Sequence, residues 1–251
     1  MKYVIANLKM NPVSLEECDH YLNTLKQEWQ KIQSSMVQLI VCPPLVYTEH
    51  FKRHLPEGIA LGAQNVFWET RGSYTGETSA LMLKNLGAEY VIVGHSERRG
   101  ILGEADDVIA RKVQAVLKEG LRPILCVGET ENERLLGRIL PVVRQQVDTA
   151  LRDVSLFQLK SVVLAYEPRW AIGTDKTPTT HEIMEMRVLL QKILVERFGR
   201  EVSDEVPILY GGSVKTKLVP QVCLEPGMDG VLVGRESLIP SEIVKMAAQC
   251  A

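Results

Sequence analysis

Residues 162–168 read Val-Val-Leu-Ala-Tyr-Glu-Pro, an apolar run that ends in a charged residue and a proline. The run does not alternate between apolar and polar residues, which is typical of a strand covered on both faces in a parallel sheet. Pro168 has no backbone N–H to offer a neighbouring strand, so the predicted strand stops before it. We therefore expect Glu167 at the carboxyl end of a buried strand.

Similar short apolar runs recur along the chain, each followed by polar or glycine-containing residues. They lie at Tyr3–Leu8, Val37–Cys42, Ile59–Ala63, Tyr90–Val93, Pro123–Val127, Val162–Tyr166, Pro207–Tyr210 and Gly230–Val233. Between them, apolar residues at helical spacing mark helices over Glu104–Lys118 and His181–Phe198. Ser14 and Glu17 predict a capping box at the start of another helix. Eight strands alternating with helices predict an α/β fold, a (β/α)8 barrel, with an open doubly wound sheet as the alternative.

The composition is that of an ordinary globular protein. No linker rich in proline, glycine or serine divides the 251 residues, so one domain over residues 1–251 is expected. Lys and Arg number 29 against 31 Asp and Glu, which argues against a nucleic-acid partner. No apolar segment approaches the roughly 18 residues of a membrane span, so a membrane partner is not expected either. Five cysteines without a C-x-x-C pair predict no disulfide framework and suit a reducing cytoplasm.

A barrel of this kind carries its chemistry where strands end and the following loops begin. The segments that follow the predicted strands hold polar and charged residues: Asn7-Leu8-Lys9-Met10-Asn11, Gly94-His95-Ser96-Glu97-Arg98-Arg99, Tyr166-Glu167-Pro168, Tyr210-Gly211-Gly212-Ser213-Val214 and Gly234-Arg235-Glu236-Ser237. The histidines are scattered, and no glycine-rich loop matches a nucleotide-binding fingerprint. Neither a metal nor a cofactor is therefore expected.

Together these residues suit one kind of chemistry, although each alone has a plain structural interpretation. A single strand-end glutamate is often salt-bridged, and a single histidine is often a hydrogen-bonded core residue. If they share one barrel mouth, Glu167 supplies a base, His95 a proton donor, Lys9 a fixed cation and Asn7 an amide. Glu97 is a carboxylate that can compensate Lys9. That set suits proton abstraction beside a carbonyl, where an enediolate oxygen needs donors and positive charge.

Two glycine-containing segments follow the last two predicted strands. They are Gly211-Gly212-Ser213 and Gly234-Arg235. In barrels, the loops after strands seven and eight frequently hold a phosphate group through backbone N–H groups. A pair of glycines can also form no more than a turn, so position is the stronger argument for a phosphate site here.

The motifs resemble those of the triosephosphate isomerase family over essentially the whole chain and in the family order. The matching segments are Asn7-Leu8-Lys9-Met10-Asn11, Ser73-Tyr74-Thr75-Gly76-Glu77, Gly94-His95-Ser96-Glu97-Arg98-Arg99, Cys126-Val127-Gly128-Glu129, Tyr166-Glu167-Pro168-Arg169-Trp170-Ala171-Ile172-Gly173-Thr174, Tyr210-Gly211-Gly212-Ser213-Val214 and Leu232-Val233-Gly234. The resemblance implies the interconversion of dihydroxyacetone phosphate and D-glyceraldehyde 3-phosphate without a cofactor.

The resemblance also implies a role for each site residue. Glu167 matches the family's base, and His95 matches an electrophile that works as neutral imidazole near a helix N-terminus. Lys9 and Asn7 match the residues that stabilise the enediolate oxygen, and Glu97 matches the acidic neighbour that organises Lys9. The positions matching the family's phosphate site are Gly173, Ser213, Gly234 and Arg235.

Two loops acquire a role from the resemblance. Pro168–Pro178 matches a mobile lid that closes over the substrate. Gln64–Glu77 is a long connection without regular pattern, which alone reads as a mobile surface loop. In the family this loop enters a second subunit, and the Thr75 position touches the neighbour's active site. A homodimer is therefore implied.

The sequence departs from the family at a few positions. Leu8 stands where tryptophan is usual, Arg169 where an apolar residue is usual, and Pro178 where alanine is usual. Because Pro178 has no N–H, we expect no bond from this position to the hydroxyl of Tyr210, which in the family helps to hold the closed lid.

Arg235 replaces a second glycine of the family's phosphate site. We expect its backbone to avoid a glycine-only angle, and its side chain to point away from the pocket toward a surface carboxylate such as Glu236. Two other functions stay open. Arg169 and Arg235 leave room for a related isomerase acting on a longer sugar phosphate such as L-erythrulose 1-phosphate. The other alternative is a barrel that binds phosphorylated ligands without turnover.

Overall fold

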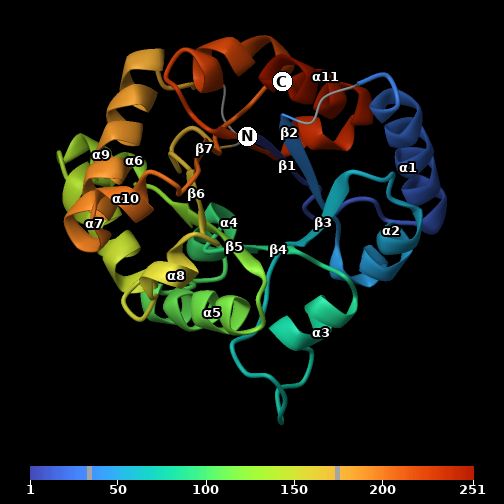
Figure 1. The fold of residues 1–251 in the computed structure, drawn as a ribbon, viewed down its shortest axis with the longest axis horizontal. Helices are drawn as coiled ribbons and strands as arrows, with labels where there is room; N and C mark the ends of the chain where they lie inside the picture. The colour runs from blue at the N-terminus through green and yellow to red at the C-terminus, as the bar shows by residue number, and fades with distance from the viewer. Residues whose placement is uncertain (33–35, 173–175) are drawn as a thin grey trace.

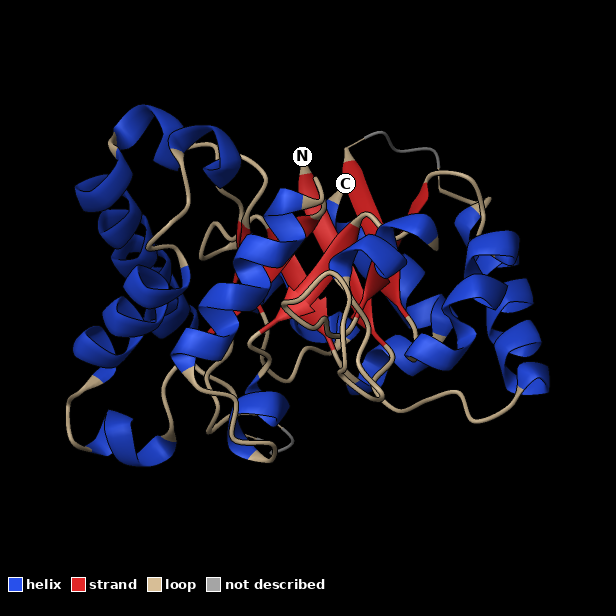
Figure 2. Ribbon diagram, turned by 90° about the horizontal axis from the view of Figure 1, so that it is seen from below, coloured by secondary structure: helices blue, strands red, loops and turns tan. Residues whose placement is uncertain are grey.

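The computed structural model describes residues 1–32, 36–172 and 176–251, and its strands form one closed parallel barrel in the order β1 to β8. Figure 1 shows the strands at the centre of a ring of helices, and Figure 2 shows the same strands crossing the middle of the molecule from the side. Both views place the two chain ends close together. The predicted (β/α)8 barrel is thus confirmed, and the open sheet is not formed.

The strands lie where the apolar runs predicted them. Their bounds are β1 Lys2–Asn7, β2 Val37–Cys42, β3 Ile59–Ala63, β4 Tyr90–Val93, β5 Arg122–Val127, β6 Val163–Tyr166, β7 Ile208–Tyr210 and β8 Gly230–Val233. The barrel closes where β1 pairs with β2 on one side and β8 on the other, with Tyr3 opposite Gly230. Only glycine fits at position 230, because a Cβ there would lie 2.0 Å from the carbonyl oxygen of Tyr3.

Helices cover the outside of the barrel. Their bounds are α1 Leu15–Trp29, α2 Thr48–His54, α3 Ala80–Asn85, α4 Ser96–Gly100, α5 Asp106–Lys118, α6 Glu131–Leu135, α7 Ile139–Ala150, α8 Leu156–Leu159, α9 Thr180–Phe198, α10 Arg200–Ser203 and α11 Pro240–Cys250, with short turns η1 Leu45–Tyr47, η2 Thr216–Leu218, η3 Pro220–Leu224 and η4 Arg235–Leu238. Among the described residues, no helix is long and apolar enough to cross a membrane.

The predicted capping box of α1 forms only in half. Ser14 accepts a hydrogen bond from the Glu17 N–H at 3.2 Å, as expected. The Glu17 carboxylate, however, accepts from the N–H of Val13 at 2.9 Å rather than from that of Ser14. The return bond is therefore made one residue earlier than the sequence pattern indicates.

Buried apolar residues form two clusters, one between the strands and helices and one inside the barrel. The inner cluster consists of Tyr3, Ile5, Ile40, Cys42, Ala60, Tyr90, Ile92, Ile124, Cys126, Val163, Ala165, Leu209 and Leu232. These side chains fill the barrel, so it is a packed core rather than a channel. The predicted catalytic residues accordingly lie at the mouth, where the strands end.

Candidate active site

The carboxyl ends of β1, β4 and β6 bring the predicted catalytic residues together. Asn7 ends β1, Glu167 follows directly on β6, and His95 is separated from the end of β4 only by Gly94. Contacts within 4 Å link Lys9 to Glu97, Glu97 to His95, and His95 to Glu167. Lys9 and Glu167, which are 158 positions apart in sequence, thus belong to one chain of polar contacts.

The Lys9 backbone adopts a left-handed conformation with φ of 55°. This conformation costs a non-glycine residue roughly 1–2 kcal/mol, so neighbouring groups must hold it. Asn7 does so by accepting from the Lys9 N–H through its side-chain oxygen at 3.1 Å. Gln64 donates to the Lys9 carbonyl at 2.8 Å from the other side, and also to the Cys42 carbonyl. The ammonium of Lys9 then reaches a Glu97 carboxylate oxygen at 2.5 Å.

His95 caps the N-terminus of α4, and this fixes which ring nitrogen can donate. Its Nδ1 accepts from the Glu97 backbone N–H at 3.3 Å. Because Nδ1 is an acceptor, a neutral ring carries its proton on Nε2. That nitrogen lies 3.2 Å from Oε1 of Glu167. His95 is therefore oriented to donate from Nε2 toward the barrel mouth.

Glu167 is the most enclosed acid of the cluster, with only 2 % of the residue exposed. Its Oε2 accepts from the Ser96 N–H at 2.8 Å, so both carboxylate oxygens face α4. Gly211 leaves the room that the side chain needs, because a Cβ there would lie 2.9 Å from Cγ of Glu167. Cys126 lies inside the barrel, where burial and the nearby Glu167 raise the pKa of its thiol well above its ordinary value.

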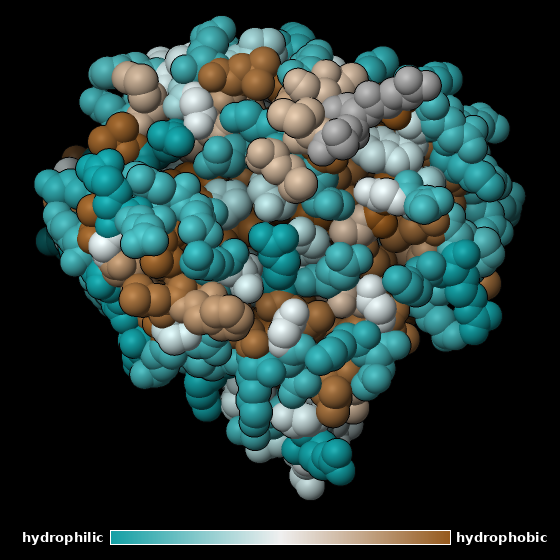
Figure 3. Space-filling model, in the orientation of Figure 1, coloured by the Kyte–Doolittle hydropathy of each residue, from teal (hydrophilic) through white to brown (hydrophobic). Residues whose placement is uncertain are grey.

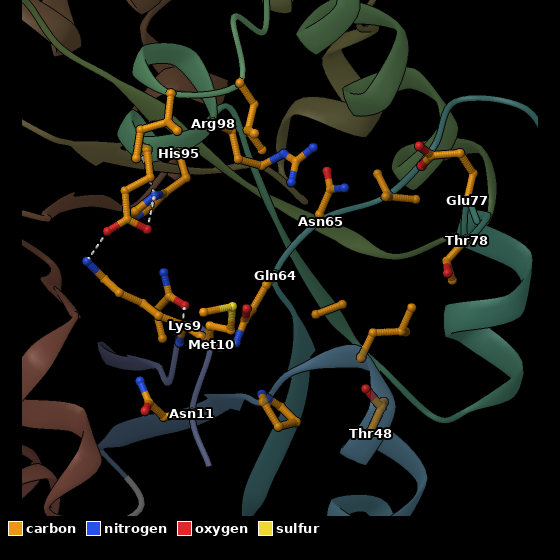
Figure 4. Close-up of a pocket in the computed structure, with 18 of the residues that line it drawn as sticks. Lys9, Met10, Asn11, Thr48, Gln64, Asn65, Glu77, Thr78, His95 and Arg98 are labelled. Atoms are coloured by element: carbon orange, nitrogen blue, oxygen red, sulfur yellow. Dashed lines mark hydrogen bonds and ion pairs between the residues drawn. The ribbon is translucent and has the colours of Figure 1, made fainter. Parts of the chain in front are cut away.

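A cavity of about 830 Å³ opens beside this cluster. Lys9 and His95 lie at one end of it, while Glu77 and Thr78 lie at the other (Figure 4). Its lining also includes the apolar side chains of Met10, Leu45, Ile101 and Leu102. The cavity therefore continues from the polar cluster toward an apolar part of the surface.

The predicted phosphate-binding residues lie on the side of Lys9 opposite the cavity. A Cβ at Gly234 would approach Cε of Lys9 to 3.0 Å, so Gly234 lies against the lysine side chain. Ser213 donates from its hydroxyl to the Ala171 carbonyl at 2.7 Å, which ties the loop after β7 to the start of the predicted lid. Gly173 lies outside the described residues. None of the three positions described on this side, Ser213, Gly234 and Arg235, lines the large cavity.

Arg235 begins the short helix η4 with an ordinary helical backbone, as expected for a position that tolerates a side chain. The side chain is exposed. The expected ion pair with Glu236 is not formed, and Arg235 has no other ion pair within the described parts of the chain. Consecutive residues of a 3₁₀ helix point about 120° apart, which separates the two side chains.

A buried carboxylate anchors the start of the predicted lid. Glu129 is fully buried and accepts from the hydroxyl of Tyr166 at 3.1 Å and from the indole N–H of Trp170 at 2.9 Å. Arg134 contributes an ion pair at 3.3 Å, and its guanidinium lies 4.7 Å from the Trp170 ring centre. Sequence reasoning assigned Glu129 no role, although its place just after a predicted strand could have indicated one.

The hydroxyl of Tyr210 is buried and has no hydrogen-bond partner among residues 1–32, 36–172 and 176–251. Pro178 has no backbone N–H, so it offers this hydroxyl no donor. Gly212 lies directly against the hydroxyl, since a Cβ there would be 2.1 Å from it.

Comparison with known proteins agrees with this geometry. The family model described as triosephosphate isomerase matches residues 2–250. A triosephosphate isomerase of Alkaliphilus oremlandii is 41% identical over 241 residues, which is 96% of each chain. Those of Thermoanaerobacter sp. strain X514 and Thermoanaerobacter pseudethanolicus are 42% and 43% identical, over 86% of this chain and 88% of theirs. With the closed barrel and the polar cluster at its mouth, these matches show that the chain belongs to the triosephosphate isomerase family.

Proposed function

We propose that the protein interconverts dihydroxyacetone phosphate and D-glyceraldehyde 3-phosphate through an enediolate, with Glu167 as the base. The observation that carries this assignment is the linked cluster of Lys9, His95 and Glu167 at the barrel mouth. A base, a neutral donor and a cation are what proton transfer beside a carbonyl requires.

Each group then has a defined task. Glu167 removes a proton from one carbon and returns it to the next, after leaving the Ser96 N–H that it accepts from in this structure. His95 donates from Nε2 to the substrate oxygen that becomes charged. Lys9 and the amide of Asn7 stabilise that negative charge, and Glu97 holds the ammonium of Lys9 in place.

The phosphate group is held by the positions after β6, β7 and β8. Gly173, Ser213, Gly234 and Arg235 are assigned to it by the resemblance, with backbone N–H groups as the main donors. The contact between Gly234 and the Lys9 side chain supports this arrangement, because it sets the phosphate end of the substrate next to the cation.

The function is tested by assaying the purified protein with glyceraldehyde 3-phosphate and, separately, with L-erythrulose 1-phosphate. We expect efficient turnover of the triose phosphate and weak or no turnover of the four-carbon substrate. Preference for the four-carbon substrate would mean that the protein is a different isomerase that uses the same enediol chemistry. Binding without turnover would overturn the catalytic assignment.

Arg235→Gly is expected to leave KM for glyceraldehyde 3-phosphate within a few-fold of the parent. The backbone N–H at this position remains in the variant, and the exposed side chain is not required to hold the phosphate. Steady-state kinetics at moderate ionic strength measures the effect.

A rise in KM of more than about tenfold, worth roughly 1.4 kcal/mol, would show instead that the guanidinium binds the phosphate. Lys217→Gly offers a control, because it removes a cation from the neighbouring η2 turn without changing the proposed phosphate site.

We further propose that the protein is a homodimer joined through Gln64–Glu77. Residues 71–77 are all exposed, and Figure 1 shows the loop before α3 projecting away from the barrel. Apolar residues are exposed nearby, including Met10 at 86% and Ile101 at 78%. Figure 3 shows apolar side chains around the base of this projection. In the dimer, Thr75 enters the partner's cavity beside Lys9 and His95.

Deleting residues 70–76 is expected to give a poorly active monomer. The deletion keeps the bond from the Phe67 N–H to the Thr78 carbonyl at 2.8 Å, which closes the base of the loop, so the barrel retains its fold. Sedimentation velocity gives the mass, and the triose phosphate assay gives the activity.

Two point variants provide a matched comparison. Ile101→Ser removes an exposed apolar side chain from the proposed interface, whereas Phe157→Ser removes one that is 85% exposed on α8. Only the first should weaken the dimer. A loop-deleted protein that still sediments as a dimer would refute the interface.

The proposed cellular location is the cytoplasm. All five cysteines are free thiols in the structure and all are buried. Their state supports a reducing compartment, where cysteines commonly remain unpaired.

A further inference from the structure

Gln146 lies on α7, outside every segment that the sequence motifs single out, yet it is bound to the loop beneath the proposed base. It is a buried residue, 7% exposed. Its Oε1 accepts from the Gly128 N–H at 2.8 Å, and its Nε2 donates to the Gly128 carbonyl at 3.2 Å. One side-chain amide thus satisfies both backbone groups of a single residue just after β5.

The backbone of Gly128 in turn packs against the backbone of Glu167. A Cβ at position 128 would lie 1.9 Å from the carbonyl oxygen of Glu167 and 2.6 Å from its carbonyl carbon. The two backbones are therefore in direct contact, with no room for a side chain between them. Any displacement of Gly128 along this direction displaces the peptide of Glu167.

Hydrogen bonds from the residues on either side of Gly128 also join this loop to the segment that begins at Glu167. The Glu167 N–H donates to the Val127 carbonyl at 2.8 Å, and the Arg169 N–H donates to the Glu129 carbonyl at 3.0 Å. Residues 127–129 thus support residues 167–169, which include the base and the first residues of the proposed lid. Gln146 holds Gly128, the middle residue of this supporting segment.

We propose that Gln146 is a positioning residue for the isomerase reaction, which it serves by holding Gly128 and thereby the backbone of Glu167. It touches no substrate. Its amide presents one acceptor and one donor at the spacing of a peptide N–H and C=O, so it cannot be replaced by an apolar side chain of similar size without leaving two buried backbone groups unpaired. The inference rests on the proposed role of Glu167 as the base.

Gln146→Leu is expected to lower kcat by about tenfold or more while changing KM little, because proton transfer is sensitive to displacements of about 1 Å. Val147→Ala is the matched control. It removes packing from the next residue of α7, which is fully buried, but leaves both hydrogen bonds between Gln146 and Gly128 intact. The control should lower the melting temperature with little effect on kcat.

Gln146→Glu gives a signature that a purely structural role would not produce. A protonated carboxyl group can accept from the Gly128 N–H and donate to its carbonyl, as the amide does, whereas a carboxylate can only accept. Burial and the facing carbonyl oxygen favour the protonated form. The ratio of variant to parent kcat should therefore rise as the pH falls from about 9 to 6, measured well below the melting temperature of each protein.

The three proteins separate the possible outcomes. A kcat for Gln146→Leu equal to that of Val147→Ala, or a pH-independent ratio for Gln146→Glu, would overturn the inference. If Gln146→Leu does not fold, the pH series on Gln146→Glu decides alone. Glu167→Asp tests the base assignment separately from the role of Gln146. Full activity of that variant would refute the assignment of Glu167 as the base, whatever the Gln146 variants show.

Discussion

Replacing Glu167 with aspartate is expected to lower kcat by about 100-fold or more without unfolding the barrel. Aspartate keeps the charge but withdraws the carboxylate by one methylene group, so it no longer reaches the carbon that must lose a proton. The backbone of residue 167 stays fixed by its bond to the Val127 carbonyl. Steady-state kinetics in both directions and a thermal melt measure the two effects.

Glu205→Asp is the control for this substitution. Glu205 is half exposed and pairs with Lys160 far from the barrel mouth, so shortening it should change neither kcat nor KM. Turnover of Glu167→Asp close to that of the parent would remove Glu167 from the role of base.

Replacing Lys9 with methionine is expected to lower kcat/KM by about 100- to 1,000-fold, which is the usual effect of removing one preorganised group from a developing oxyanion. Methionine preserves the length and much of the shape of the side chain, so the loss is mainly one of charge. Stability should change little, because Glu97 is 42% exposed and remains solvated when its partner is removed.

Lys160→Met removes an exposed lysine that is also ion-paired, and it should leave catalysis unchanged. Circular dichroism and melting curves confirm that both variants fold. An active Lys9→Met protein would mean that the ammonium only balances Glu97.

The fold was predictable because each buried strand is a short apolar run followed by glycine, proline or a polar residue. Four of the runs, Val37–Cys42, Ile59–Ala63, Tyr90–Val93 and Gly230–Val233, coincide with strands at both ends. Where helix bounds differ, side-chain contacts explain the difference. The sequence predicts a helix that begins at Glu104, whereas α5 begins at Asp106. Glu104 stays outside the helix because its carboxylate binds Arg98 and Lys112.

The site was predictable only in part, for a physical reason. Lys9 and Glu167, to which we assign catalytic roles, lie just after the ends of strands, so their place in the sequence reveals their place in the barrel. Gln64 and Gln146 act by binding backbone groups of loops that are 55 and 18 positions away. No local pattern encodes such a contact, because the side chain only has to arrive with a donor and an acceptor at the right spacing.

The seam between β1 and β8 has a consequence for how the protein is made. Tyr3 pairs with Gly230, and its N–H donates to the Asp229 carbonyl at 2.9 Å. A nascent chain therefore carries β1 with one open edge until β8 has left the ribosome. Truncation from the C-terminus that removes β8 does not trim one strand from a border, as it would in an open sheet. It uncovers β1 and β7 together, and unpaired edges of apolar strands are sites of aggregation.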